Sequence, residues 1–111
     1  MALYEELQID QASTFEYTVT LSNPNGTGFD LTSYTATGRL KRSYSSSTSV
    51  DFDISYSTPA TDGKVRLYLS DETTAAMKAG HYVWDVVIEN ASGEKFRVIE
   101  GIAEVNPGVT L

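Results

Sequence analysis

The sequence predicts an all-β fold: an immunoglobulin-like antiparallel β-sandwich of about seven strands, with one short helix near residues 71–79. Apolar and polar residues alternate with period two along most of the chain, and turn-forming segments separate the alternating runs. Serine and threonine account for 25 of the 111 residues, which suits strands and turns better than helices. With 41% hydrophobic residues, we expect one core and one domain over residues 1–111.

The first two elements lie before a turn at residues 22–28. Within residues 1–9, the apolar side chains of Leu3, Leu7 and Ile9 indicate a first strand or an extended arm. No hairpin turn precedes Phe15 to hold this segment in place, so we expect a docking arm that pairs with a neighbouring subunit, or an edge strand. Residues 15–21 then alternate cleanly, which predicts a strand with one solvent-exposed face.

Two strands flank the polar loop at residues 43–49. Residues 34–41 and 50–56 both alternate, and their polar positions carry opposite charges. A turn centred on Ser46 sets the register, and the expected cross-strand pairs are Arg39 with Asp53 and Lys41 with Asp51. This pairing is favoured over an acid–base or metal-binding role for the two aspartates.

The predicted helix follows a strand at residues 65–69. Ser70 or Asp71 caps its start and Gly80 ends it. The residues expected on its packed side are Thr73, Ala76 and Met77. Because about two turns are too short to be stable alone, the helix is expected to pack over the end of the sheet as a crossover.

The last two strands form a hairpin around a turn at residues 90–94. Residues 82–88 are apolar on both faces, which predicts a central strand with Trp84 in the core. In the final strand the apolar residues switch from even to odd positions. They are Phe96 and Val98, followed by Ile99, Ala103 and Val105. A β-bulge near residues 97–99 restores one core-facing set. Pro107 ends the strand.

Composition excludes several classes of site. The chain has no cysteine and one histidine, which excludes disulfides, thiolate zinc sites and multi-histidine metal sites within it. The net charge of -7 disfavours nucleic acid as a partner. Residues 1–10 lack the features of a signal peptide, and no apolar run is long enough to span a bilayer, so we expect no membrane partner. Two glycosylation acceptor patterns occur, at Asn25 and Asn90, where chance produces about one, and we do not interpret them as a signal.

No combination of residues predicts catalysis or a cofactor. His81 lacks a triad motif, and Asp85, four residues along the same strand face, is too distant to orient it. The turn that begins at Asn23 resembles a calcium loop only superficially, because its twelfth position is Tyr34 where glutamate is required. We therefore expect no catalytic, metal or cofactor-binding residue.

Candidate contact residues are aromatic or apolar. Arg39, Lys41, Arg42 and Tyr44 form a small basic and aromatic patch, which we interpret as a solvated strand end rather than a phosphate site. Exposed tyrosines are enriched at protein contacts and sugar-binding sites. Together with the N-terminal segment they make the candidate set Leu3, Tyr4, Leu7, Ile9, Tyr44 and Tyr68.

The chain resembles a family of phage proteins between Asp30 and Val105. The resemblance is carried by DLTSYTATGRLKRSYSSSTSVDF and by GKVRLYLSDETTAAMKAGHYVWDVVIENASGEKFRVIEGIAEV. These segments are similar to small virion proteins of tailed bacteriophages, including cyanophage-type structural proteins, and to the N-terminal domain of phage baseplate upper proteins. The resemblance implies a non-enzymatic structural protein, localised to the virion, in the tail, baseplate or neck or on the capsid surface. It also implies other virion proteins as partners, a symmetric multimer and no small-molecule substrate.

Two other functions stay open at this point. The chain is alternatively a recognition module that binds a host-surface glycan or protein through tyrosine-bearing loops. An enzyme is the third reading, and the sequence offers no constellation of residues for it.

Overall fold

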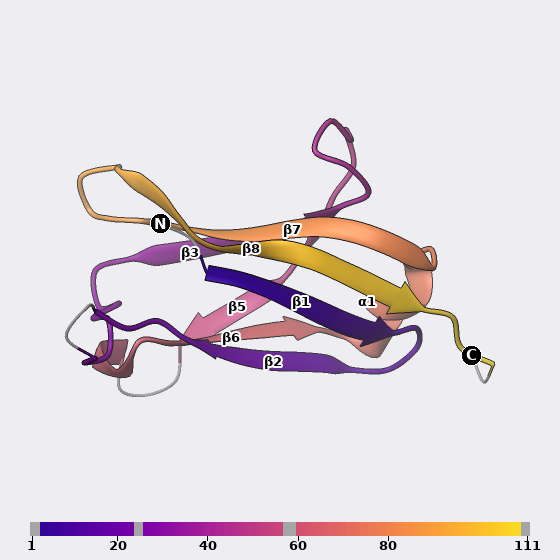
Figure 1. Cartoon of the computed structure of the whole chain (residues 1–111), viewed down its shortest axis with the longest axis horizontal. Helices are drawn as coiled ribbons and strands as arrows, with labels where there is room; N and C mark the ends of the chain where they lie inside the picture. The colour runs from indigo at the N-terminus through magenta and orange to yellow at the C-terminus, as the bar shows by residue number, and fades with distance from the viewer. Residues whose placement is uncertain (1–2, 24–25, 57–59, 110–111) are drawn as a thin grey trace.

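Two β-sheets pack face to face in the computed structural model, which describes residues 3–23, 26–56 and 60–109 (Figure 1). The five-stranded sheet has the order β1 (Leu3–Asp10), β8 (Lys95–Asn106), β7 (Gly80–Glu89), β3 (Thr35–Lys41) and β4 (Val50–Asp51). The three-stranded sheet has the order β2 (Phe15–Thr20), β6 (Lys64–Leu69) and β5 (Asp53–Tyr56). The expected all-β sandwich is confirmed, and β7 is the central strand of its sheet.

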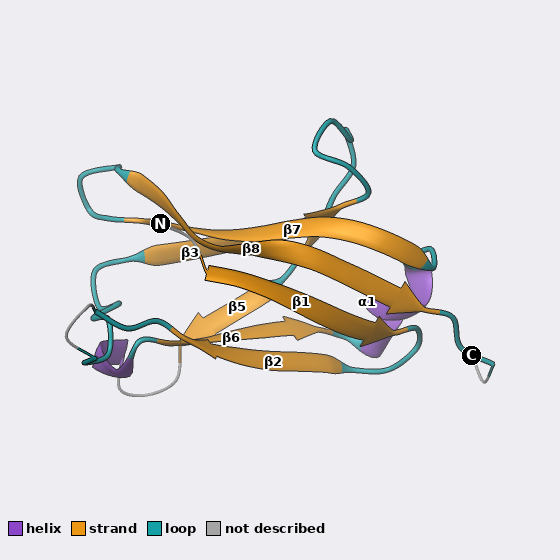
Figure 2. Ribbon diagram, viewed as in Figure 1, coloured by secondary structure: helices purple, strands orange, loops and turns teal. Residues whose placement is uncertain are grey.

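Helical structure lies at the two ends of the sandwich in the described part of the chain (Figure 2). It consists of α1 (Asp71–Ala76) and a 3₁₀ turn at Ala60–Asp62. Neither is long and apolar enough to cross a membrane, and no other helix occurs among these residues. α1 connects β6 of one sheet with β7 of the other, so the expected crossover is confirmed.

The helix is shorter than predicted. Ser70 caps it, since its Oγ accepts a hydrogen bond from the Thr73 backbone N–H at 3.2 Å. It ends at Ala76 because Met77 already has an extended backbone. The packed residues are Thr74 and Met77, whereas Ala76 is exposed, so the expected packed side was only partly right.

β1 is the edge strand of the five-stranded sheet, and it runs parallel to β8. This is a departure from the purely antiparallel sandwich that the sequence predicted. Leu7 and Ile9 point into the core and are buried, so residues 3–9 form the edge strand that was one of the two alternatives, and not the docking arm. Gly101 allows the close approach of β1 and β8, because a Cβ there would lie 1.8 Å from the Glu5 carbonyl oxygen.

The predicted strand at residues 50–56 divides at Phe52 and changes sheet. β4 pairs with β3, the Phe52 backbone N–H donates to the Gly38 carbonyl at 2.9 Å, and Asp53 then pairs with Tyr68 in the other sheet. The predicted register is therefore wrong. Arg39 faces Asp51, with Nε 3.0 Å from Oδ1, while Lys41 has no aspartate opposite it. A shift of two residues keeps every side chain on its face, so alternation alone does not distinguish these registers.

The predicted β-bulge occurs in β8. Val86 pairs with Ile99 and Val87 pairs with Arg97, which leaves Val98 as the extra residue. The bulge brings Ile99, Ala103 and Val105 into the core. Phe96 lies on the same face, opposite Ile88, but it is 46% exposed because it projects beyond the end of the core.

Trp84 fills the centre of a core that has no disulfide. Its side chain is 3% exposed, packs edge-on against Phe52 at 5.8 Å between ring centroids, and donates from Nε1 to the Glu5 carbonyl at 3.2 Å. Two residues earlier, the Tyr82 hydroxyl donates to the Lys78 carbonyl at 2.9 Å, as in the tyrosine corner of immunoglobulin domains. Trp84 thus stands where those domains carry their second cysteine.

We expect Tyr82→Phe to lower the free energy of unfolding by about 1–2 kcal/mol, because it leaves the partly buried Lys78 carbonyl without its donor. Urea unfolding measures the change. Tyr44→Phe is the control, since that hydroxyl belongs to a highly exposed residue and its loss should leave the midpoint unchanged. Equal urea midpoints for the two variants would show that the hydrogen bond between Tyr82 and the Lys78 carbonyl contributes no stability.

Candidate functional site

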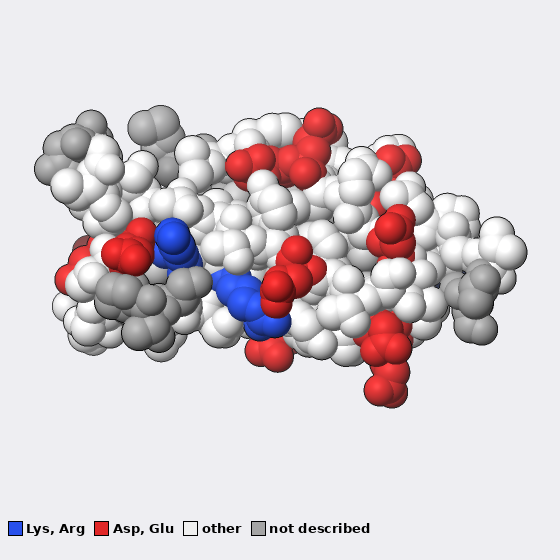
Figure 3. All heavy atoms as spheres, turned by 90° about the horizontal axis from the view of Figure 1, so that it is seen from below, with Lys and Arg blue, Asp and Glu red and all other residues white. Residues whose placement is uncertain are grey.

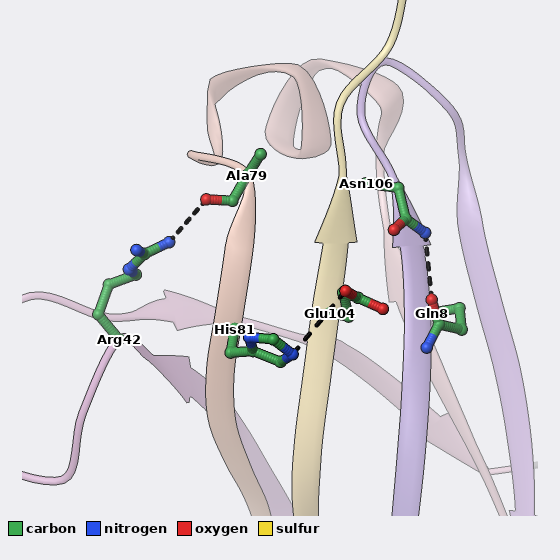
Figure 4. Close-up of polar contacts among 6 residues, drawn as sticks. All are labelled: Gln8, Arg42, Ala79, His81, Glu104 and Asn106. Carbon is green, nitrogen blue, oxygen red and sulfur yellow. Dashed lines mark hydrogen bonds and ion pairs between the residues drawn. The ribbon is translucent and has the colours of Figure 1, made fainter.

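Acidic and histidine side chains do not assemble into a metal site within the described residues. No group of three or more His, Cys, Asp or Glu side chains there is placed to hold a metal ion. His81 projects from β7 towards Glu104 of β8, with Nε2 3.8 Å from Oε2 (Figure 4). Both side chains are largely exposed, so this pair stabilises the sheet weakly. Asp85 accepts a hydrogen bond from Arg97 instead, at 3.2 Å.

The open side of the sandwich is the feature that most resembles a binding site. β1 has a hydrogen-bonded neighbour on one side only, and β2 is likewise the edge of the other sheet. Figure 1 shows these two edge strands lying one above the other along the same side of the molecule. In each strand, alternate backbone groups point away from the neighbouring strand, and an edge strand can therefore pair with an added one.

Two hollows border β1 along this side. The side hollow, of about 320 Å³, lies between β1 and β2 and is lined by residues that include Leu7, Ser13, Phe15 and Tyr17. The end hollow, of about 440 Å³, lies at the start of β1. Its lining is mostly apolar and includes Leu3, Leu21, Phe29, Tyr34, Phe96 and Val98. Leu3 is 47% exposed, so apolar surface continues from the end hollow onto the edge strand.

The loop at residues 29–34 forms one wall of the end hollow. The Phe29 and Tyr34 rings lie 5.4 Å apart, and the Tyr56 hydroxyl donates to the Tyr34 carbonyl at 2.8 Å. Burial raises the pKa of Tyr56, so this donor stays protonated well into the alkaline range. Asp30 accepts hydrogen bonds from the hydroxyl and backbone N–H of Thr32, at 2.5 Å and 2.9 Å. These contacts hold the loop in a tight turn.

We expect the Asp30 carboxyl to titrate below the ordinary aspartate value of 3.8, because the hydroxyl and then the backbone N–H of Thr32 lower its pKa. At pH values above the ordinary aspartate pKa, the ionised Asp30 therefore stabilises the folded turn. This stabilisation is lost as the pH falls through the lowered pKa of Asp30 in the folded protein. An NMR titration of the side-chain carboxyl carbon measures the midpoint. Thr32→Val should raise this midpoint, because it removes the hydroxyl that donates to Asp30. An unchanged midpoint in Thr32→Val would contradict the assignment to the hydroxyl.

A second exposed feature is the loop between β3 and β4, which stands away from the sandwich in Figure 1. Tyr44 on this loop is 78% exposed and borders a shallow depression of about 240 Å³. Arg39, Lys41 and Asp85 line the same depression. Arg42 turns away from it, since its guanidinium lies over the Tyr82 ring and donates to the Ala79 carbonyl at 3.0 Å (Figure 4).

The structure places the six candidate contact residues in four separate locations. Leu3 and the 60% exposed Tyr4 lie together at the start of β1. Leu7 and Ile9 are core residues whose strand positions point between the sheets, and Leu7 also lines the side hollow. Tyr44 lies on the β3–β4 loop, and Tyr68 lies on the other sheet, partly covered by Arg66 with its Cζ 4.7 Å from the ring centroid.

Sequence reasoning did not identify the end hollow. Its lining combines residues from β1, the end of β2, the loop at residues 29–34 and the start of β8. The available signal was the switch of apolar residues from even to odd positions after Phe96 and Val98. Both sets of apolar residues were assigned to the core. Phe96 has the alternation of a core residue, but the strand extends past the opposite sheet, so the side chain borders the hollow instead.

Comparisons with known proteins bear on the fold. No protein-family model matches the sequence, and no curated protein matches it. The GspB Siglec domain is similar in structure, with a TM-score of 0.57 and 14% sequence identity over 93% of this chain. The chain spans 54% of that chain's length. This similarity agrees with the immunoglobulin-like fold that the sequence predicted.

Two further structures cover nearly all of this chain with lower scores. One is of VGSC beta subunits, with a TM-score of 0.47 and 12% identity over 93% of this chain and 92% of that one. The other is AggA, the major subunit of aggregative adherence fimbriae type I from Escherichia coli. Its TM-score is 0.42 and its identity is 9%, over 95% of this chain and 91% of AggA.

Proposed function

We propose that this chain is a non-enzymatic structural module that acts through protein–protein contact, and that it is a building block of a tailed-bacteriophage virion. The observation that carries the contact function is the open side of the sandwich, where an unpaired edge strand borders two hollows. The virion role rests on the sequence resemblance between Asp30 and Val105. Its location there is the tail, baseplate or neck, or the capsid surface.

The surface supports protein partners over nucleic acid. The net charge is -7, and Figure 3 shows acidic side chains spread over the underside of the molecule, with basic ones confined to its left half. Such a surface repels phosphate. Exposed apolar and aromatic side chains instead provide contact area, and they include Leu3, Tyr4, Tyr44, Phe96 and Ile102. We propose other virion proteins as partners, in a symmetric multimer that uses no cofactor and no small-molecule substrate.

Mass spectrometry of purified, dissociated particles tests the virion role. The chain should be recovered in fixed stoichiometry with other particle proteins, and crosslinks should involve the open side of the sandwich. Absence of the chain from particles made by a host that expresses it would overturn the virion role. Particle crosslinks confined to the opposite β4 and β5 edges would overturn the contact surface.

A glycan-recognition module is the second candidate, and Tyr44 favours it. An exposed aromatic ring beside Arg39, Lys41 and a shallow depression provides stacking and hydrogen-bonding groups of the kind that sugars need. A glycan array probed with the protein and with Tyr44→Ala tests this alternative. Binding that disappears in the variant would support it, and an array without any bound glycan would reject it.

A further inference from the structure

We propose that β1 is an acceptor strand, which adds an extended segment of a partner protein with lysine or arginine on its outer face and apolar residues on its inner face. The proposal rests on the proposed contact function and specifies its site and partner chemistry. It follows from three features of the same strand: a free edge, hollows beside it, and charged side chains that are all acidic.

The free edge sets the length and conformation of the segment. β1 pairs with β8 over all eight residues from Leu3 to Asp10, and no described strand pairs with its other edge. An added strand continues the established order β1-β8-β7 by one position and pairs with backbone groups along this edge. A partner segment of about eight residues spans it, at about 3.3 Å per residue.

The hollows set the chemistry of the inner face. Alternate side chains of an added strand point between the two sheets. At the start of β1 they approach Leu3 and the apolar lining of the end hollow, where valine, isoleucine or leucine removes apolar surface from water. The side hollow further along has a mixed lining, in which Leu7, Phe15 and Tyr17 lie among polar and acidic residues.

The charge sets the chemistry of the outer face. Tyr4, Glu6, Gln8 and Asp10 are the outward-facing residues of β1, and none of them is basic. The outward carboxylates of β1 itself are Glu6 and Asp10. Lysine or arginine on an added strand lies beside these two carboxylates, and opposite charges on adjacent strands stabilise the pairing.

The same charge argues against a second copy of this chain as the occupant. Pairing of β1 with another β1 brings together two strands that each carry Glu5, Glu6 and Asp10 and no basic residue. Acidic residues on an edge strand also prevent uncontrolled self-pairing. A basic partner segment relieves this repulsion, whereas a second copy increases it.

A designed peptide takes the place of the partner segment in the test. The probe alternates valine and lysine over about nine residues, to span β1. A second peptide has the same composition, with the lysines first and the valines after them. A third is the alternating peptide with N-methylated backbone nitrogens, which cannot add to an edge. Fluorescence anisotropy measures affinity, and ¹⁵N NMR with hydrogen exchange locates the contact.

We expect the alternating peptide to bind about tenfold more tightly than either of the other two, because only it combines strand pairing with the correct face pattern. The amides of β1 should shift and gain protection from exchange. Glu6→Lys should weaken binding by about threefold to tenfold. Asp53→Lys makes the same change in net charge at an exposed position on the far edge of the other sheet, and it should weaken binding less.

Equal affinity for the three peptides would overturn the proposal, because it would mean that charge alone drives binding. Contacts that map away from β1, or equal effects of Glu6→Lys and Asp53→Lys, would also overturn it. The particle experiment remains separate. If the chain is found in virions but β1 does not bind the peptide, the acceptor-strand proposal fails and the virion role stands. If the peptide adds to β1 but the chain is absent from particles, the acceptor-strand proposal stands and the virion role fails.

Discussion

Replacing Trp84 with alanine is expected to lower the free energy of unfolding by about 3–5 kcal/mol, a large share of the stability of a small domain. The indole is 3% exposed and sits between the sheets, in contact with Phe52. Its Nε1 also donates to the Glu5 carbonyl, so the substitution removes a link between β7 and β1 as well as apolar volume. Urea unfolding followed by circular dichroism measures the loss.

The fluorescence of the native protein gives an independent check, because Trp84 is the only tryptophan. Its emission should be blue-shifted in the native state and move to the solvated value on unfolding. Trp84→Phe is the matched variant, since it keeps an aromatic ring but loses the indole donor, and it should cost less than the alanine change. A fully solvated native emission maximum would show that the indole is not in the core.

Gly101→Ala is expected to displace β1 and to cost about 3 kcal/mol, at the upper end of the range for overpacking. The added methyl group would lie 1.8 Å from the Glu5 carbonyl oxygen and 2.8 Å from the carbonyl carbon. Both are backbone atoms, so no side-chain rotation relieves the clash and the strand itself must move. Chemical unfolding and hydrogen exchange of the β1 amides measure the two consequences.

Gly38→Ala is the matched control for Gly101→Ala. A Cβ at Gly38 would lie 3.0–3.1 Å from side-chain atoms of Ile54, Phe52 and Val86, which are able to shift by a few tenths of an ångström. The control should therefore cost less and leave β1 protected. Equal stability of the two variants, with β1 protected in both, would contradict the close packing of β1 on β8. Because β1 is also the proposed acceptor, Gly101→Ala should abolish binding of the alternating peptide.

Local patterns in the sequence were sufficient for much of the fold. The alternation of side chains predicted the strands because a strand places successive residues on opposite faces whatever its neighbours are. The Ser70 cap was predictable because it involves backbone groups within a few residues. The bulge at Val98 was predictable from the parity change, since both apolar sets needed the core.

The candidate site was harder to predict from the sequence. Leu3 and Tyr4 were identified as contact residues and lie exposed at the start of β1, but Leu7 and Ile9 were assigned to the same surface and are buried. Their spacing is the same whether the strand pairs within its own sheet or with another subunit. The end hollow involves four separate segments of the chain, and no local pattern records that they meet.

The sequence by itself determined most of the strands and turns, the core position of Trp84 and the acidic net charge. These properties depend on short-range periodicity and composition. Only the tertiary structure decided that β1 lies parallel to β8, that the chain changes sheet at Phe52 and that Arg39 faces Asp51. These outcomes depend on which distant surfaces bury each other, because a register shifted by two residues satisfies the same alternation. In the observed register, Phe52 lies beside Gly38 and packs against Trp84 between the sheets.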